Sequence, residues 1–323
     1  MSELGPTNPL LSVVIAIVSD TTGSRCDVSH LAGSLTALAQ QLDPPPMEIL
    51  VPYHPEVAGI EELRQRFPNV VFLPVNDLRT FTGLGGSREH HDELRARGLA
   101  AARGALVALI EDHGRPDPRW CAQIVAAHRH GYAAIGGAIE NGIDRPLNWA
   151  VYFCDFGKYQ NPVRAGESAF ASDANICYKR AALEAIRTVW MESFHEPAVN
   201  AALLSRGEKL VLSLEIIVYQ HRGNLTLGRA LKERYIWGRS YAATRSRQLG
   251  ARRLIYAALS PVLPAVMLMR MALNVIQKRR LIGAFLTALP LIALLSVSWS
   301  WGECMGYVSG YTTKGMKRLV RLQ

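Results

Sequence analysis

Three potential metal ligands, Glu111, Asp112 and His113, stand directly after an apolar run at 105–110. Such a run is typical of a strand that is buried on both faces of a parallel α/β sheet. Ligands of these sheets bind just beyond the carboxyl ends of the strands. Carboxylate and imidazole groups are suited to Mg²⁺ or Mn²⁺, and a cation held there can clamp a diphosphate. The alternative is that the three residues end a strand before the turn at Pro116.

The segments around this run alternate between the patterns of strands and helices. Apolar runs predict strands at 11–18, 47–51, 70–75 and 106–110, and helical spacing predicts helices at 28–42 and 88–103. This alternation predicts a three-layer α/β domain with a largely parallel sheet. The glycine-rich turn at 83–86 lacks the spacing of a dinucleotide site. The run His90–Glu93 is interpreted as a solvated helix start, because neighbouring helix residues point in different directions.

Further polar groups follow in the middle of the chain. Gly136 and Gly137 lie in a strand of small residues, where another backbone or a ligand can come close. Asp173 and Asn175 precede a strand that leads into a helix, and Glu196 precedes the helix expected at 198–205. An acid at a helix start either interacts favourably with the helix dipole or takes a proton from a substrate hydroxyl.

Composition limits the partners of this 323-residue chain. Its 36 Lys and Arg residues against 27 Asp and Glu give a charge of +9, which favours phosphorylated ligands, acidic lipid or nucleic acid. We do not expect nucleic acid, because zinc-finger spacing, an RNA-binding signature and a basic recognition helix are all missing. The five cysteines form no Cys-x-x-Cys pair, so a disulfide framework is not expected and a reducing compartment fits. Without a signal-peptide pattern, we expect the catalytic part in the cytoplasm.

The last third of the chain differs in character. Residues 225–247 have the basic amphipathic pattern of a helix on an anionic membrane surface, with a solvated helix as the alternative. Two uncharged segments follow at 254–269 and 281–301, and the second is long enough to cross a bilayer. A crossing hairpin would place Lys278–Arg280 on the far side, against the positive-inside tendency. Helices that lie in the cytoplasmic leaflet would avoid this conflict. A hairpin that crosses the membrane remains the alternative. The basic tail 314–321 is expected at the same surface.

These motifs, in this order, resemble the family 2 glycosyltransferases over about residues 10–225. The resemblance is carried by the strand at 11–18 and by Arg97–Gly104 leading into Glu111-Asp112-His113, which stands where the family has Asp-x-Asp. Gly136-Gly137, Asp173-Ala174-Asn175 and His195-Glu196, followed by Gly207, resemble its acceptor-side and catalytic-base segments. It implies a GT-A domain at 1–225, a basic linker helix at 226–250, and membrane-associated helices with a basic tail at 251–323.

The resemblance also implies roles for individual residues. Glu111, Asp112 and His113 would hold Mn²⁺ or Mg²⁺ on a diphosphate. Asp112 would also reach the sugar or the ribose, and His221 would add a metal or phosphate contact. Glu196 would act as the general base in a direct displacement with inversion. Substrate contacts are expected from Asp20, Asp173, Asn175, His195 and Arg222. For His221 and Arg222 the alternative is a strand end that meets an amphipathic helix.

Donor and acceptor are less defined. The second strand runs into Pro52-Tyr53-His54, where the family usually places an Asp that reads the nucleobase, and Asp20 is a substitute for that contact. We expect a UDP-linked sugar. Membrane attachment indicates a lipid-linked acceptor or an envelope glycan, in cell-envelope polysaccharide synthesis at the cytoplasmic face of the inner (plasma) membrane.

Two other classes of protein remain open. A degenerate GT-A domain would bind a nucleotide-sugar without turnover, and the missing nucleobase Asp favours it. A membrane-bound nucleotidyltransferase would release pyrophosphate. The latter is disfavoured because no Gly-rich, Lys-containing loop stands near the first strand.

Overall fold

The computed structural model describes residues 8–18, 28–79 and 88–310. The chain divides into two compact units, of which the first holds 1–140 and 159–221 and the second 141–158 and 222–323. The segment 141–158 thus belongs with the C-terminal helices rather than with the residues that flank it. Asp20, the turn at 83–86 and the basic tail at 314–321 lie outside the described residues.

The first unit is built on a nine-stranded mixed sheet in the order β3-β2-β1-β4-β8-β6-β9-β5, with β7 paired to β9. Its strands are β1 (Leu11–Ala16), β2 (Met47–Tyr53), β3 (Val70–Pro74), β4 (Leu106–Glu111), β5 (Gly114–Pro116), β6 (Ala134–Asn141), β7 (Gly166–Glu167), β8 (Asn175–Lys179) and β9 (Leu210–Gln220). All six residues of β1 are buried, because both faces of the sheet are covered.

Only half of this sheet is parallel, which corrects the expectation of a largely parallel sheet. β3, β2, β1 and β4 run parallel, whereas β8 pairs antiparallel with β4, and β5 and β7 pair antiparallel with β9. The alternation stops after β4, since two residues separate β4 from β5 and a parallel return needs a long crossover. Gly137 allows the close approach of β6 and β9 in this antiparallel half. A Cβ at this position would lie 1.9 Å from the carbonyl oxygen of Ile216 in β9.

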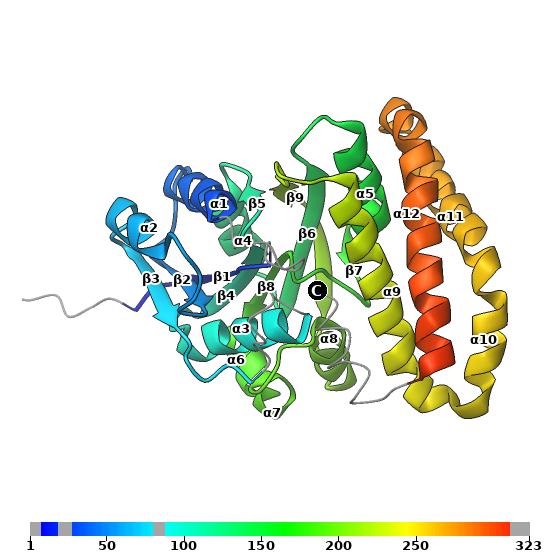
Figure 1. The fold of residues 1–323 in the computed structure, drawn as a ribbon. Helices are drawn as coiled ribbons and strands as arrows, with labels where there is room; N and C mark the ends of the chain where they lie inside the picture. Colours follow the sequence, from blue (N-terminus) through cyan, green and yellow to red (C-terminus); the bar gives the residue numbers. More distant parts are fainter. Residues whose placement is uncertain (1–7, 19–27, 80–87, 311–323) are drawn as a thin grey trace, which may run out of the picture. The chain divides into compact units, whose positions relative to one another are not determined.

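Helices cover both faces of the sheet, which confirms the three-layer prediction (Figure 1). One face is covered by α1 (Ser29–Ala39), α2 (Ile60–Arg66) and α4 (Trp120–Ala127), whose buried side chains share one apolar core. The other is covered by α3 (Arg88–Ala101), α6 (Arg180–Glu184), α7 (Arg187–Trp190) and α8 (Glu196–Ser205). The helix expected from residue 181 is thus two short helices, α6 and α7.

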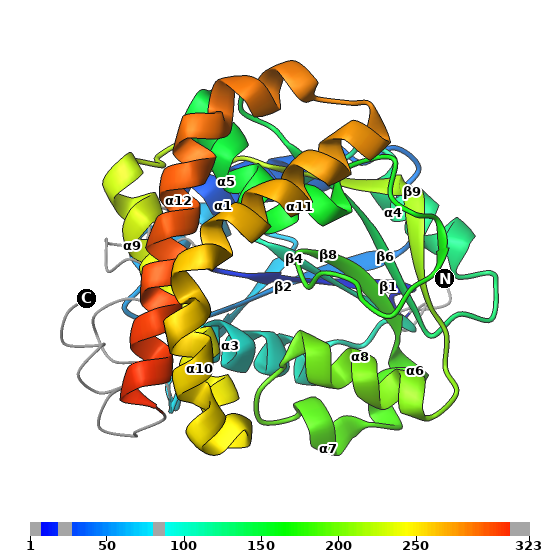
Figure 2. The same ribbon diagram turned by 90° about the vertical axis from the view of Figure 1, so that its right-hand side faces the viewer.

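The second unit is helical. It contains α5 (Pro146–Phe156), α9 (Leu227–Leu249), α10 (Arg253–Leu259), α11 (Leu263–Lys278) and α12 (Ile282–Ser309), with 3-10 turns at Gly157–Tyr159, Gly250–Arg252 and Ser260–Val262. Residues of α5, α9, α11 and α12 share one apolar core. Figure 2 shows α10 and α11 as a bent rod beside α12. The stretches Gly250–Lys278 and Ile282–Ser309 are long and apolar enough to cross a membrane.

Candidate active site

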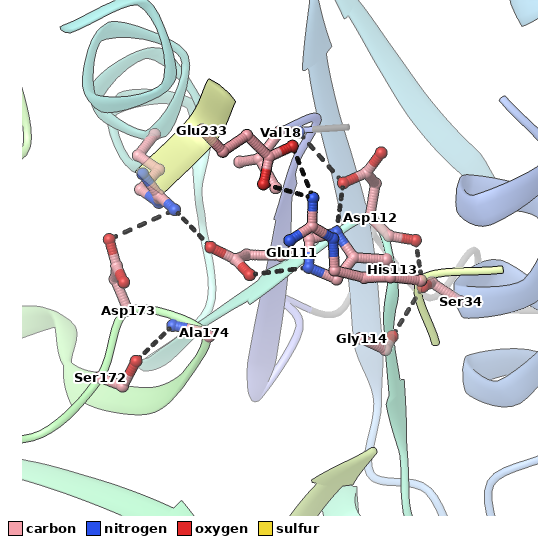
Figure 3. A network of polar contacts seen from close by, with 12 residues as sticks. Val18, Ser34, Glu111, Asp112, His113, Gly114, Ser172, Asp173, Ala174 and Glu233 are labelled. Atoms are coloured by element: carbon pink, nitrogen blue, oxygen red, sulfur yellow. Dashed lines mark hydrogen bonds and ion pairs between the residues drawn. The ribbon is translucent and has the colours of Figure 1, made fainter. Parts of the chain in front are cut away.

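The motif Glu111-Asp112-His113 lies where β4 ends beside the end of β1. The parallel register aligns Ala16 with Glu111, and the Asp112 amide donates to the carbonyl oxygen of Ala16 at 3.0 Å. The Asp112 carboxylate is completely buried and accepts a hydrogen bond from the Val18 amide at 3.0 Å (Figure 3). On α1, the Ser34 hydroxyl lies 2.6 Å from the carbonyl oxygens of both Asp112 and Gly114. The carboxyl end of β4 is therefore held rigidly against β1 and α1.

His113 lies between the two carboxylates that precede it (Figure 3). Its Nε2 is 3.3 Å from Oε2 of Glu111, and its Nδ1 is 3.3 Å from Oδ1 of Asp112. Burial alone would lower the pKa of His113, but the hydrogen bonds to Asp112 and Glu111 outweigh it and raise the pKa to about 9. The pKa of Glu111 is lowered, because His113 and Arg95 outweigh the effect of its burial.

The three side chains of the motif contact one another in this structure. Carboxylate and imidazole are suitable ligands for Mg²⁺ or Mn²⁺. However, Glu111, Asp112 and His113 bind one another, and no three His, Cys, Asp or Glu side chains in the described ranges are placed to hold a metal ion. A cation would require His113 to leave the two carboxylates.

A buried guanidinium connects the motif with two other segments. Arg95, on α3, is 3 % exposed. Its Nη2 lies 3.3 Å from Oε1 of Glu111 and 3.2 Å from Oδ2 of Asp173, and its Nη1 lies 3.2 Å from Oδ1 of Asp92. Burial would lower the pKa of Arg95, but these carboxylates and that of Glu196 raise it above its usual value. Arg95 thus joins the end of β4 to the segment before β8.

Arg95 was not singled out from the sequence, although one signal was there. It follows Asp92 by three residues on a helix, a spacing at which side chains share a face. The expectation of a solvated start at His90–Glu93 is wrong, since all four side chains are buried in the first turns of α3. Burial raises the pKa of Asp92 to about 6, although Arg95 and Arg88 act against this rise.

Glu196, the expected general base, is the first residue of α8 and is partly exposed. Its Oε1 accepts a hydrogen bond from Nδ2 of Asn200 at 2.9 Å. The Oδ1 of Asn200 in turn accepts one from the Tyr178 hydroxyl at 2.9 Å, and both of these partners are buried. This chain fixes the orientation of the Glu196 carboxylate while leaving it accessible. Neither Asn200 nor Tyr178 was found from the sequence.

Asp173 and His195 lie close to the same network. Asp173 is bound to Arg95, and its side chain is 17 % exposed. His195 is exposed and precedes α8. Its pKa is lowered by partial burial and by Arg88, against the effect of Asp173. Both side chains therefore stand beside the carboxylates that Arg95 gathers.

Asn175 is completely buried, and its amide joins strands. Its Nδ2 donates to the carbonyl oxygens of Ala138 in β6 and Ile216 in β9, at 2.8 and 3.0 Å. Its Oδ1 accepts from the indole nitrogen of Trp120 at 2.9 Å. These bonds occupy both ends of the amide, so they hold the antiparallel half of the sheet together.

His221 follows β9, and its amide donates to the carbonyl oxygen of His113 at 2.8 Å. Burial lowers the pKa of His221 to about 4, and Arg115, His30 and His113 add to this effect. His221 is therefore neutral near pH 7 and lies beside the motif.

Arg222 belongs to the second unit. There its Nη2 lies 2.8 Å from both carboxylate oxygens of Glu233 on α9, and its carbonyl oxygen accepts from Asn148. The strand β9 ends at Gln220 and the basic helix α9 begins at Leu227. Locally, this segment is therefore a strand end that meets an amphipathic helix, which was the alternative for His221 and Arg222.

Comparison with solved structures finds similar architectures in two glycosyltransferases. A mannosyltransferase from Pyrobaculum calidifontis, solved with GDP-Man and Mn²⁺, matches with a TM-score of 0.50 and 13 % identity over 92 % of this chain and 88 % of its own. S. aureus TarS residues 1–349, solved with UDP-GlcNAc, gives a TM-score of 0.48 and 12 % identity over 94 % and 93 %. No family model and no curated sequence matches. The chain therefore shares the mixed α/β fold of the mannosyltransferase.

Proposed function

We propose that the chain is a glycosyltransferase whose active site lies at the carboxyl ends of β1 and β4. The observation that carries the proposal is the network of ion pairs around the buried Arg95. Its guanidinium binds Glu111, Asp92 and Asp173 and also interacts electrostatically with Glu196. Several carboxylates concentrated at the ends of the strands are unusual unless they handle charge or protons. The fold supports a nucleotide-sugar as the ligand.

Glu196 acts as the general base in this proposal. An acceptor hydroxyl attacks the anomeric carbon of the donor sugar while Glu196 takes its proton. The new glycosidic bond forms as the bond to the diphosphate breaks, and the nucleoside diphosphate leaves with the electron pair. A single displacement of this kind inverts the configuration at the anomeric carbon. Asn200 and Tyr178 hold the carboxylate in place for this step.

The donor is proposed to be a UDP-linked sugar and the acceptor a lipid-linked molecule or an envelope glycan. A membrane-bound acceptor agrees with the apolar C-terminal helices, and the site of action would be the cytoplasmic face of the inner (plasma) membrane. A polyprenyl phosphate acceptor would attack through its own phosphate oxygen and would not need Glu196. Comparing Glu196→Gln on an alcohol and on a phosphate acceptor therefore separates the two classes.

The proposal is tested first by binding. Thermal unfolding is recorded with UDP-, GDP- and dTDP-sugars, each with Mn²⁺ and with a chelator. One donor should raise the midpoint in a concentration-dependent way, because a ligand that binds only the folded state stabilises it. The Mn²⁺ arm decides whether His113 gives way to a cation. No stabilisation by any donor in either arm would contradict nucleotide-sugar binding.

Turnover is then measured with the donor that binds. Transfer should release the nucleoside diphosphate from the donor. Release of pyrophosphate from a nucleoside triphosphate supplied with a sugar phosphate would instead indicate a nucleotidyltransferase. Binding without turnover of any acceptor would indicate the degenerate alternative.

A further inference from the structure

Helix α12 is packed along its length within the second unit. In its C-terminal half, Gly302 and Gly306 lie against the backbone of α9. A Cβ at these positions would be 2.1 Å from the carbonyl oxygen of Tyr235 and 2.4 Å from that of Arg239. The Ser298 hydroxyl donates to the carbonyl oxygen of Leu231 at 2.8 Å. This half of α12 therefore packs directly against residues 231–243 of α9.

The stretch of α9 that contacts α12 contains several charged residues. Lys232, Glu233, Arg234 and Arg239 all fall within the contact region, and the guanidinium of Arg234 lies over the Trp299 ring at 5.6 Å. A crossing α12 would take these charges into the hydrocarbon of the bilayer, where charged side chains are costly. The geometry of α9 and α12 is therefore incompatible with a free membrane-spanning α12.

The N-terminal half of α12 is covered as well. Phe285 packs edge-on against Phe153 of α5 at 5.2 Å between ring centroids, and Ala288, Ile292 and Leu295 are completely buried. On another side, Cys304 and Tyr307 contact Ala257 and Tyr256 of α10. Ten of the 28 residues of α12 are thus buried within the second unit, and its outer row of side chains is exposed.

The unit exposes large apolar side chains all along α10, α11 and this outer row. Ile255 and Ile276 are 60 % and 62 % exposed although they lie far apart along the rod. The other exposed members are Leu254, Leu259, Val262, Met269, Leu273, Ile282, Leu286, Leu289, Leu294, Val297, Trp301 and Val308. Exposed apolar surface of this extent is typical of an interaction site.

The charges beside this face have one sign. From residue 250 to 309 the chain has six basic residues and one acidic residue, Glu303. Glu303 is buried and accepts hydrogen bonds from Trp299 and Tyr307. The basic residues lie at both ends of the rod and in its middle, at Arg252, Arg253, Arg270, Lys278, Arg279 and Arg280. A crossing helix would place positive charge on both sides of the bilayer, whereas a helix in the plane would bring all six to one anionic surface.

We propose that α10, α11 and the outer row of α12 form a docking face that lies in the plane of an anionic bilayer without crossing it. The apolar side chains enter the boundary between headgroups and acyl chains, and the basic residues bind the headgroups. This inference rests on the proposed membrane association of the chain and not on its catalytic step.

Binding is tested with the full chain by sedimentation with vesicles of phosphatidylcholine alone and of phosphatidylcholine containing phosphatidylglycerol. The protein should prefer the anionic vesicles, and added salt should weaken binding. Ile255→Ser combined with Ile276→Ser should weaken it by about tenfold or more, and Arg279→Glu with Arg280→Glu should remove the anionic preference. Met191→Ser, which removes an exposed apolar side chain of the first unit, is the matched control. Equal binding by all variants would overturn the proposal.

Depth is tested with a fluorophore on Leu254→Cys, Val262→Cys and Leu273→Cys, with lipid-borne quenchers at two depths. The parent chain, treated alike, gives the background from native cysteines. An in-plane rod predicts one shallow depth for all three positions, whereas a deep Val262 between two shallow ends would overturn the proposal. A dimer that buries this face and does not bind vesicles would also overturn the proposal. Sugar transfer to a soluble acceptor in detergent is measured separately, so that failure of the docking face and failure of the proposed catalysis are distinguished.

Discussion

Arg95 on α3 and Asp173 in the segment before β8 form a buried ion pair, with Nη2 of the arginine 3.2 Å from Oδ2 of the aspartate. The same nitrogen lies 3.3 Å from Glu111 at the end of β4. One guanidinium therefore ties the parallel and antiparallel halves of the sheet together at the proposed active site. Arg95 reaches three carboxylates with two of its nitrogens, which the single ammonium group of a lysine cannot reproduce in the same geometry.

Replacing Arg95 should damage both stability and activity. Arg95→Met leaves Asp92, Glu111 and Asp173 without their common partner, so we expect a loss of about 3–5 kcal/mol in the free energy of unfolding. Arg95→Lys should remain folded and lower kcat more than it raises KM for the donor. Urea unfolding and steady-state kinetics measure these effects. The matched control is Arg97→Lys, an exposed arginine paired with Asp77. Equal kinetics for the two lysine variants would contradict a positioning role of Arg95.

Removing the hydroxyl of Tyr178 tests the chain that orients Glu196. Tyr178→Phe deletes the donor to Asn200 and lets the amide turn away from Glu196. We expect kcat to fall by about tenfold, equivalent to about 1.4 kcal/mol, with donor binding unchanged. The Phe ring preserves the contact with Phe194, so the unfolding midpoint should change little. A large loss of stability with normal kcat per folded molecule would assign Tyr178 to packing alone.

The ion pair between Glu48 and Arg103 predicts a pH dependence of stability. Ser12 and Arg103 hold the pKa of Glu48 below its usual 4.5, against the effect of its burial. Because the folded pKa is depressed, this stabilisation is present above the unfolded value and is lost as the pH falls through the folded one. Glu48→Gln should therefore cost about 1–3 kcal/mol at neutral pH and progressively less below pH 4.5. Glu61→Gln, an exposed pair with Arg64, should show no such trend.

Gly137 should not tolerate a side chain. A Cβ there would meet the Ile216 carbonyl oxygen and the Asn175 amide at 1.9 and 2.5 Å, and both groups are fixed by the sheet. Gly137→Ala should therefore lower the free energy of unfolding by about 1–3 kcal/mol or prevent folding. Gly131→Ala is the control, because a Cβ there meets no atom within 4 Å. Thermal unfolding compares the two, and equal midpoints would mean that β6 and β9 can move apart.

The first half of the fold was predicted from the sequence because local patterns decide it. The strands at 11–18, 47–51, 70–75 and 106–110 correspond to β1, β2, β3 and β4 within two residues at each end. Strands were also expected where β6 and β8 lie, but the antiparallel pairing of this half was missed, since the pairing of β9 with β5 and β7 joins residues far apart in the sequence. Neither turn chemistry nor periodicity reports such a pairing.

The candidate site was predicted only in part for a similar reason. The adjacency of Glu111, Asp112 and His113 is visible in the sequence, but their mutual bonds depend on side-chain directions at the end of β4. The run His90–Glu93 is buried with partners such as Arg95 for Asp92 and Arg79 for Glu93, which local polarity does not indicate. Every expected role in the reaction stays a prediction, namely those of Glu111, Asp112, His113, Asp173, Asn175, His195, Glu196, His221 and Arg222, and that of Asp20, which lies outside the described residues.

The central claim is tested most directly by sugar transfer from the binding nucleotide-sugar to an alcohol acceptor, with wild type compared to Glu196→Gln. The variant keeps the size of the side chain and a group able to bond Asn200, but it cannot accept a proton. We predict a fall in kcat of about a hundredfold or more, with donor binding unchanged. Glu192→Gln, an exposed glutamate paired with Arg79, should transfer as wild type does. Transfer by Glu196→Gln at the wild-type rate would contradict the account.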